Sequence, residues 1–170
     1  MGRILAILMA VVMMLSLTAC IDSAPTKELI EATSSKTAKE ETFALNESAV
    51  FSNLKFTATE IKESQGDGFF VPENGNVFVG VKFTIENISN EEQTVSSLLL
   101  FEGYVDDIKC DFSLNASCAF DEGELDGSIA AGKKLVGWYA LEVPKDWKEI
   151  ELDVQSSWIS NSAAKFVFTK

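Results

Sequence analysis

The sequence predicts an all-β protein, in which short strands form an antiparallel β-sandwich behind an N-terminal signal peptide and a flexible tether. Several segments alternate apolar with polar residues, which is the period of a strand that buries one face. Stretches rich in glycine, asparagine, aspartate and proline separate these segments and are typical of turns. The 170 residues show no repeat of fixed period and have the length of one domain.

The first twenty residues have the composition of a secretory signal. Arg3 supplies a positive charge, residues 4–17 form a long apolar run, and the small Ala19 precedes Cys20. The run Leu17-Thr18-Ala19-Cys20 resembles the bacterial lipobox, Leu-x-x-Cys, whose cysteine receives a diacylglycerol and becomes the first residue after cleavage. The resemblance implies that residues 1–19 are a lipoprotein signal peptide and that Cys20 is the lipidation site, an anchor and not a nucleophile.

Two other interpretations of this segment are a retained transmembrane helix and an ordinary secreted product. The apolar run is shorter than the ~20 residues that cross a bilayer, and no cluster of positive charges follows it. Leu17 stands three residues before Cys20 and Ala19 directly before it, and this pattern argues against a cysteine that follows the apolar run by chance. We therefore expect a lipid-anchored protein on the extracytoplasmic face of the cell membrane, at the bacterial cell surface.

Residues 20–46 are expected to form a lipid-anchored flexible linker. They are rich in serine, threonine, alanine, lysine and glutamate, and Phe43 is their first aromatic residue. A segment with so little apolar surface to bury does not fold by itself. As a coil of about 25 residues it would span roughly 25 to 30 Å.

The folded domain is expected over residues 47–170. Its alternating segments are residues 54–59, 77–85, 134–143, 149–155 and 166–168. The turn-forming stretches between them are residues 65–68, 73–76, 87–92, 131–133 and 144–146. Several short strands with such breaks indicate an antiparallel sandwich.

The charge of the chain restricts its partners. The 26 acidic and 14 basic residues give a net charge of −12. Loss of Arg3 with the signal peptide makes the mature chain about one unit more negative. A surface of this sign repels phosphate backbones, so we expect no nucleic-acid partner.

The chain contains no histidine, which removes the Ser-His-Asp and Cys-His arrangements and the usual neutral-pH proton shuttle. Paired carboxylates could still catalyse glycoside hydrolysis, but they need a fixed separation in a cleft, which a small sandwich with short turns seldom provides. We therefore expect no enzymatic activity.

Cys110 and Cys118 are the two cysteines that remain besides Cys20. An even pair in a chain bound for an oxidising compartment favours a disulfide between them. Free thiols are the alternative.

Three runs carry a resemblance to a known family: residues 76–87, 125–134 and 136–146, of which the last ends in Val143-Pro144-Lys145-Asp146. They resemble the DUF4352 family of secreted bacterial lipoproteins, over about residues 47–170. The resemblance implies an immunoglobulin-like β-sandwich related to a mycobacterial immunoprotective antigen, and it implies no activity or catalytic residues. Ala131, where the family commonly has proline, and the Cys110/Cys118 pair depart from the family pattern.

An acidic cluster, made of Asp121, Glu122, Glu124 and Asp126, is the candidate metal site. Carboxylate oxygens are the ligands that calcium takes, and Asp106, Asp107 and Asp111 could add to them. The EF-hand spacing is not met, because Gly123 and Leu125 stand where ligands are required. A solvated acidic loop is the favoured interpretation and calcium the alternative; apart from the diacylglycerol on Cys20, no cofactor is expected.

Three aromatic residues are candidates for binding. Phe69 and Phe70 follow Gly66-Asp67-Gly68, so they could form either a docking tip or a lid that folds back over the end of the sandwich. Of the two, the lid is favoured. Trp138 shares the parity of Lys134 and Glu142, which predicts partial exposure.

The sequence as a whole predicts a noncatalytic binding module at the bacterial cell surface, whose partner is another envelope or extracellular protein. The alternative is a small-ligand or calcium-sensing extracellular module.

Overall fold

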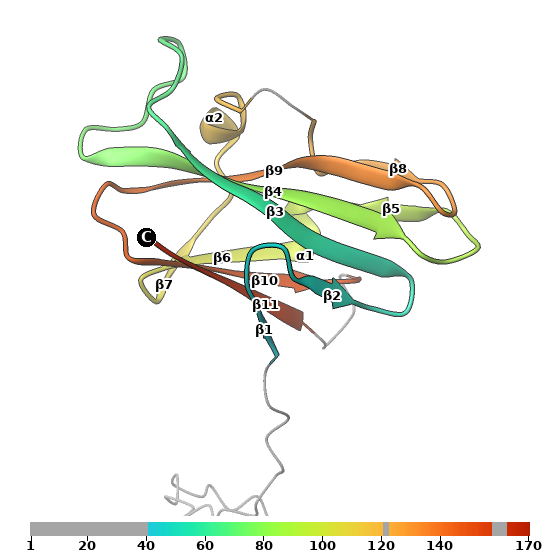
Figure 1. The fold of residues 1–170 in the computed structure, drawn as a ribbon. Coiled ribbons are helices and arrows are strands. Elements are labelled where there is room, and N and C mark those ends of the chain that lie inside the picture. The colour runs from blue at the N-terminus through green and yellow to red at the C-terminus, as the bar shows by residue number, and fades with distance from the viewer. Residues whose placement is uncertain (1–40, 121–122, 158–162) are drawn as a thin grey trace, which may run out of the picture. The chain divides into compact units, whose positions relative to one another are not determined.

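The computed structural model describes residues 41–120, 123–157 and 163–170. The signal peptide, Cys20 and most of the expected tether lie outside these residues, as do Asp121 and Glu122. The described chain forms two β-sheets packed face to face, which Figure 1 shows as an upper and a lower layer. The predicted all-β sandwich is confirmed.

The first sheet has the strand order β2-β3-β4-β9. Its strands are β2 (Ser48–Val50), β3 (Leu54–Ser64), β4 (Asn76–Asn87) and β9 (Lys134–Pro144). All of its pairings are antiparallel, and a register shift interrupts the β3–β4 pairing between Ala58 and Glu60. The long hairpin β3–β4 extends past the other strands and carries the loop of residues 65–75 at its end (Figure 1).

The second sheet has the strand order β1-β11-β10-β6-β7. Its strands are β1 (Thr42–Phe43), β11 (Ala163–Thr169), β10 (Glu149–Gln155), β6 (Phe101–Val105) and β7 (Ile108–Cys110). In contrast to the purely antiparallel expectation, β1 pairs in parallel with β11.

The predicted start of the domain at residue 47 is too late. Phe43, assigned to the linker from its polar neighbours, pairs with Phe166, and the two ring centroids lie 5.4 Å apart. One aromatic residue is enough to hold this segment on the sandwich, because the segment adds a strand, β1, to the edge of the second sheet beside β11.

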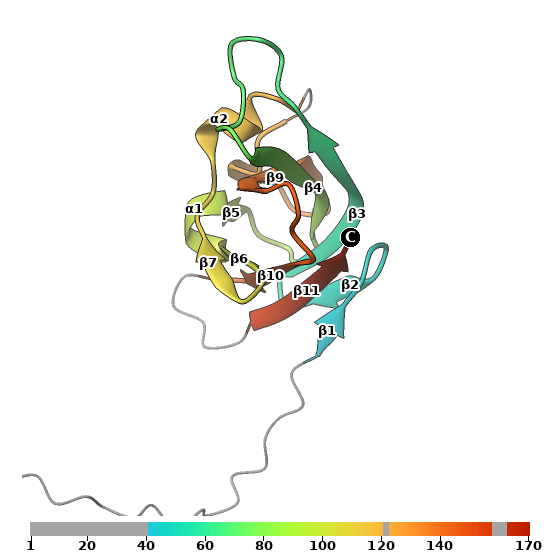
Figure 2. The ribbon, with the colours of Figure 1, turned by 90° about the vertical axis from the view of Figure 1, so that its left-hand side faces the viewer.

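Four short elements complete the described fold. The ribbon of β5 (Gln93–Val95) and β8 (Gly127–Ile129) extends the end of the first layer, while α1 (Ser97–Leu100) and α2 (Leu114–Ser117) lie on the same side of the molecule in Figure 2.

The main core lies between the two sheets. Alternate residues of β4 supply Val79, Val81, Phe83 and Ile85, all fully buried, and β9 adds Tyr139. The Phe83 ring meets the rings of Phe101 and Phe166 edge-on, at 5.1 and 5.2 Å between centroids. The period-two pattern in the sequence thus selects the face that the second sheet covers.

Candidate functional site

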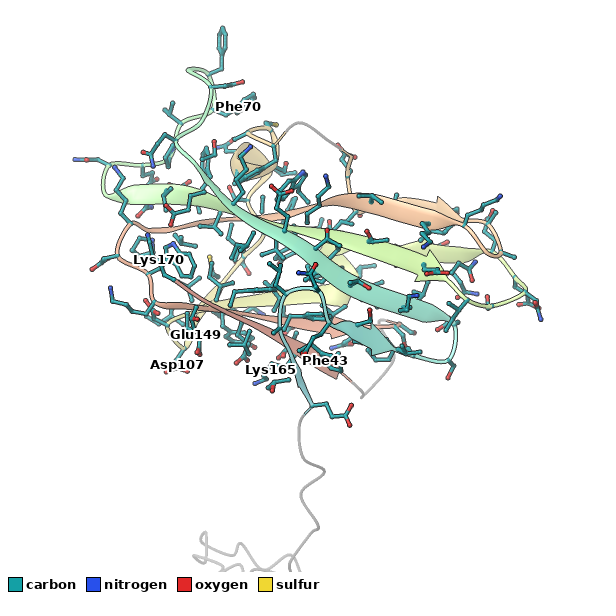
Figure 3. The ribbon with its side chains drawn as sticks, viewed as in Figure 1. Phe43, Phe70, Asp107, Glu149, Lys165 and Lys170 are labelled. Carbon is teal, nitrogen blue, oxygen red and sulfur yellow. The ribbon has the colours of Figure 1, made fainter. Side chains whose placement is uncertain are left out.

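The tip loop, which we define as residues 65–75, carries three exposed apolar residues. Phe69 is 92% exposed, more than any other large apolar residue of the described chain. Its neighbours Phe70 and Val71 are 38% and 56% exposed. Figure 3 shows Phe70 above the upper layer, on a loop that rises clear of the strands.

The backbone of the tip loop is fixed by its polar residues. One carboxylate oxygen of Asp67 accepts hydrogen bonds from the backbone N–H groups of Phe69 and Phe70, both at 3.2 Å, and the Asp67 N–H donates to the Phe70 carbonyl at 3.3 Å. Gly66 adopts a φ of +81°, and a Cβ there would lie 1.8 Å from the Phe70 oxygen. The turn therefore requires glycine at position 66.

The base of the loop is held from β9. The Glu142 carboxylate accepts hydrogen bonds from the Glu73 N–H at 2.7 Å and from the Asn76 side-chain amide at 3.0 Å. The Asn76 N–H also donates to the Glu73 carbonyl at 2.9 Å. The C-terminal end of the tip loop is thus anchored without the packing of its aromatic rings.

The lid interpretation of the aromatic pair is wrong for Phe69. A lid would bury the ring against the sandwich end, whereas the Phe69 ring faces solvent. The physical reason is the Asp67 turn, which reverses the chain before the ring can fold back. The docking-tip alternative is the one that the geometry fits.

Trp138 is buried, so the prediction of partial exposure is wrong. It does point away from the main core, as its parity predicts, but α2 and the chain after it cover that outer face of β4 and β9. Its ring stacks on Phe120 at 5.0 Å, and Lys82 lies 5.5 Å from the ring centroid. Together with Phe78, Ala116 and Ala140 these rings form an outer core.

The sequence gives a weak indication that residues 116–120 pack over Trp138. Ala116 and Phe120 are four residues apart, which is the spacing of one helical face. That spacing, rather than strand parity, would have predicted that apolar residues of this segment pack on the sheet.

The acidic cluster is only partly described. Asp121 and Glu122 lie outside the described residues, while Glu124 is exposed and its backbone bridges to Trp138. The Asp126 carboxylate accepts hydrogen bonds from the Ser97 N–H at 3.0 Å and the Ser97 hydroxyl at 2.6 Å. Asp126 thus holds the start of α1, and within the described ranges no group of three or more aspartate, glutamate or cysteine residues is placed to hold a metal ion.

A hollow of about 300 Å³ lies beside the outer core. Phe112, Leu114, Phe120 and Trp138 supply apolar walls, and Glu124 and Asp126 lie at its acidic side. This volume is at the lower end of the range for small-ligand sites.

Cys110 and Cys118 are free thiols in the structure, so the predicted disulfide is not formed there. The Cys110 sulfur lies 3.5 Å from the Glu142 carbonyl oxygen, on β7 at the edge of the sandwich, whereas Cys118 follows α2 and is exposed. Burial, with a smaller effect from Asp111 and Glu142, raises the pKa of the Cys110 thiol.

Carboxyl groups with shifted pKa values are paired with lysines. A hydrogen bond from Lys170 is the main cause that lowers the pKa of Glu63, whose carboxylate also accepts from the Trp147 indole at 2.8 Å. Lys55 and then Lys134 lower the pKa of Glu86. These shifts favour the ionised form, the reverse of what a general acid requires.

The described residues include no helix with the length and apolar character needed to span a bilayer.

Solved structures share this fold. The candidate lipoprotein ycdA from Bacillus subtilis has a TM-score of 0.60 at 13% identity, with 72% of this chain and 38% of ycdA covered. The secreted protein MPT63 from Mycobacterium tuberculosis has a TM-score of 0.54 at 12% identity, with 79% and 100% covered. A β-sandwich protein from Clostridium difficile 630 has a TM-score of 0.52 at 17% identity, with 77% and 94% covered.

This chain spans well under half of ycdA, and at such low identities the likeness extends to the fold alone. No curated protein matches the sequence. The family model described as a domain of unknown function (DUF4352) matches residues 43–164, which is most of the chain and confirms the resemblance seen in the sequence; this protein belongs to the DUF4352 family.

Proposed function

We propose that this chain is a lipid-anchored, extracytoplasmic binding domain that recognises an envelope or extracellular protein and catalyses no reaction. The observation that carries the proposal is Phe69, exposed on a loop that polar bonds hold in place. Burial of a phenylalanine side chain is worth about 1.5 to 3 kcal/mol, and the free domain forgoes that gain. Aromatic rings on ordered backbone are typical anchors of protein interfaces.

A location outside the cytoplasm is supported by two independent observations. The lipobox-like run ends at Cys20, and the fold is shared with the candidate lipoprotein ycdA and the secreted protein MPT63. The described chain begins at β1, on the side of the sandwich away from the tip loop (Figure 1). A chain that arrives from an anchor at Cys20 therefore joins the domain at the end opposite Phe69.

The proposal that the chain is noncatalytic is consistent with the two carboxyl groups whose pKa values are shifted. Glu63 and Glu86 are paired with lysines that lower their pKa values, so they remain ionised at neutral pH. General acid catalysis needs a carboxyl group with a raised pKa beside a substrate cleft.

The anchor is tested by metabolic labelling with an alkyne analogue of palmitate. The wild-type chain should take up the label and fractionate with membranes, while Cys20→Ala should remain unlabelled and unprocessed. Equal labelling of both chains, or the same fractionation without label, contradicts the anchor.

The binding function is tested by photocrosslinking in living cells of the bacterium that encodes the chain. A photoreactive residue is placed in turn at five exposed apolar positions: Leu45, Phe69, Ile88, Leu99 and Ile108. A binding domain should give a discrete cross-linked product from at least one of them. No discrete product from any of the five contradicts a binding function.

A small-ligand module is the second candidate, and the hollow beside Trp138 favours it. Leu114 lines this hollow and is 72% exposed, so Leu114→Glu should change the hollow without a loss of core packing. A thermal-shift screen of small apolar amines tests this function. A compound that raises the melting temperature of the wild-type chain but not of Leu114→Glu supports it, and no active compound contradicts it.

A further inference from the structure

We propose that Phe69 enters an apolar pocket of the partner protein and that lysine or arginine side chains border this pocket. The inference rests on the proposed binding function and adds the chemistry of the partner. It follows from three properties of the tip loop: an exposed apolar apex, a backbone ordered before binding, and an acidic surround.

The apex offers apolar surface from three successive residues. Phe69 and Val71 are mostly exposed, and Phe70 between them is partly exposed. Interface residues that carry most of the binding energy are large, often aromatic, and fill a pocket in the partner. A flat surface would contact Phe69 and leave its sides in water, whereas a pocket buries the whole ring.

The loop is ordered before any partner arrives. Its turn is closed by Gly66 and the Asp67 carboxylate, and its base by the hydrogen bonds of Glu142. Binding therefore orders little additional backbone, which lowers the entropic cost of association. The same bonds keep the ring from collapsing onto the domain.

Charge identifies the border of the pocket. Residues 63–81 contain Glu63, Asp67 and Glu73 but no lysine or arginine. Lys170 pairs with Glu63, and the Lys145 N–H donates to the Gly75 carbonyl at the base of the loop. Within the loop itself the charged residues are Asp67 and Glu73, on either side of the aromatic apex. Complementary charge around an apolar contact accelerates encounter and selects the partner, so a basic border fits this loop.

A lipid surface fits the tip loop poorly. Peripheral insertion into bacterial membranes combines apolar residues with basic ones that attract anionic headgroups, and the tip loop has the opposite sign.

A second copy of this chain fits no better. The hollow beside Trp138 could accept a ring by volume, but Glu124 and Asp126 lie along it and would face Asp67 of the incoming loop. The net charge of −12 opposes self-association as well. The structure thus favours a different, cationic protein as the occupant.

The test begins with p-benzoylphenylalanine in place of Phe69 in the full-length, lipidated chain. Irradiation of cells should give one discrete product, and mass spectrometry should place the attachment point in an apolar pocket with lysine or arginine at its border. The same substitution at Ile108, 72% exposed on the far layer, is the matched control and should not give this product.

The captured protein is then purified, and its dissociation constant for the mature chain is measured. Phe69→Ser should weaken binding roughly thirtyfold or more. Glu73→Lys should weaken it by about two- to tenfold, and raising the salt from about 0.05 to 0.5 M should also weaken it. Glu73 takes part in the loop's hydrogen bonds through its backbone N–H and its backbone carbonyl, so this variant keeps them.

Glu92→Lys is the matched control for charge. It is exposed, changes the net charge by the same two units, and follows β4 at the end away from the tip loop. Its dissociation constant should stay within about twofold of the wild-type value.

The remaining outcomes separate the inference from the proposed function. Attachment of position 69 to phospholipid or to a second copy of this chain overturns the inference, and so does binding that ignores both salt and Glu73→Lys. A product from another exposed position but none from position 69 overturns the inference and leaves the binding function standing. No product from any position overturns both.

Discussion

Phe120 and Phe69 should respond differently to replacement by alanine. Phe120 is 7% exposed and stacks on Trp138 in the outer core, whereas Phe69 is 92% exposed. We expect Phe120→Ala to destabilise the domain strongly and Phe69→Ala to leave its stability unchanged. The two variants test the two predictions that the structure corrects: the partial exposure of Trp138, and the lid formed by Phe69.

The expected magnitudes follow from burial. A buried phenylalanine contributes about 1.5 to 3 kcal/mol by transfer from water, and a stacked aromatic pair adds about 0.5 to 1.5 kcal/mol. Phe120 borders the hollow, so water can enter the space that its ring leaves, and the additional penalty of an empty cavity is small. We therefore expect Phe120→Ala to lower the free energy of unfolding by about 2 to 4 kcal/mol. The small buried part of Phe69 is worth about 0.2 kcal/mol.

The measurement is urea unfolding of a soluble chain without residues 1–20, followed by circular dichroism and tryptophan fluorescence. Phe120→Ala should lower the midpoint with little change in the slope, and it should shift native-state tryptophan emission to longer wavelength as Trp138 meets water. A loss below about 0.5 kcal/mol for Phe120→Ala refutes the outer core. A loss above about 1 kcal/mol for Phe69→Ala refutes the free tip and removes the basis of the docking proposal.

Three further predictions concern thiols, capping and pH. The Cys118 thiol should react with iodoacetamide at pH 8 faster than the Cys110 thiol, because burial raises the pKa of Cys110 and lowers its thiolate fraction. Asp126→Ala should lower the free energy of unfolding by about 1 to 3 kcal/mol with or without calcium, since it leaves a buried N–H without its acceptor. The lowered pKa of Glu63 adds stability that is present above its ordinary value of 4.5 and is lost as pH falls below it. Lys170→Met should make stability less dependent on pH in that acidic range, as thermal unfolding at several pH values would show.

Each of these predictions has a clear contradicting result. If neither thiol reacts until the protein has been reduced, Cys110 and Cys118 form the disulfide that the sequence predicts. A calcium-dependent loss of stability in Asp126→Ala would return the acidic cluster to a metal role. An unchanged acidic slope in Lys170→Met would mean that the ion pair with Glu63 does not form in solution.

The sequence predicts the long strands well because each of them buries one face. Residues 54–59, 77–85, 134–143 and 149–155 all fall within strands of the structure. Six strands were not predicted: β1, β2, β5, β6, β7 and β8. All of them except β6 have only two or three residues, which carry no measurable period. Pairing with a neighbour, not local pattern, makes them strands.

The sequence likewise predicts only part of the candidate site. Glycine and aspartate before two phenylalanines predict a turn with an aromatic pair, and the choice between lid and tip was open in the sequence. That choice depends on hydrogen bonds that the carboxylates of Asp67 and Glu142 accept from the loop backbone. Glu142 is 75 residues further along the chain than Asp67 and reaches the loop only in the folded sheet.

The sequence by itself determined the class of fold and the family, since these reside in periodicity and in contiguous runs. It also carries the lipobox-like run that predicts an anchor at Cys20. Only the tertiary structure decided which aromatic ring faces water. Parity assigns a residue to a face of a sheet, but exposure depends on what covers that face: α2 and Phe120 cover Trp138, while nothing in the described chain covers Phe69.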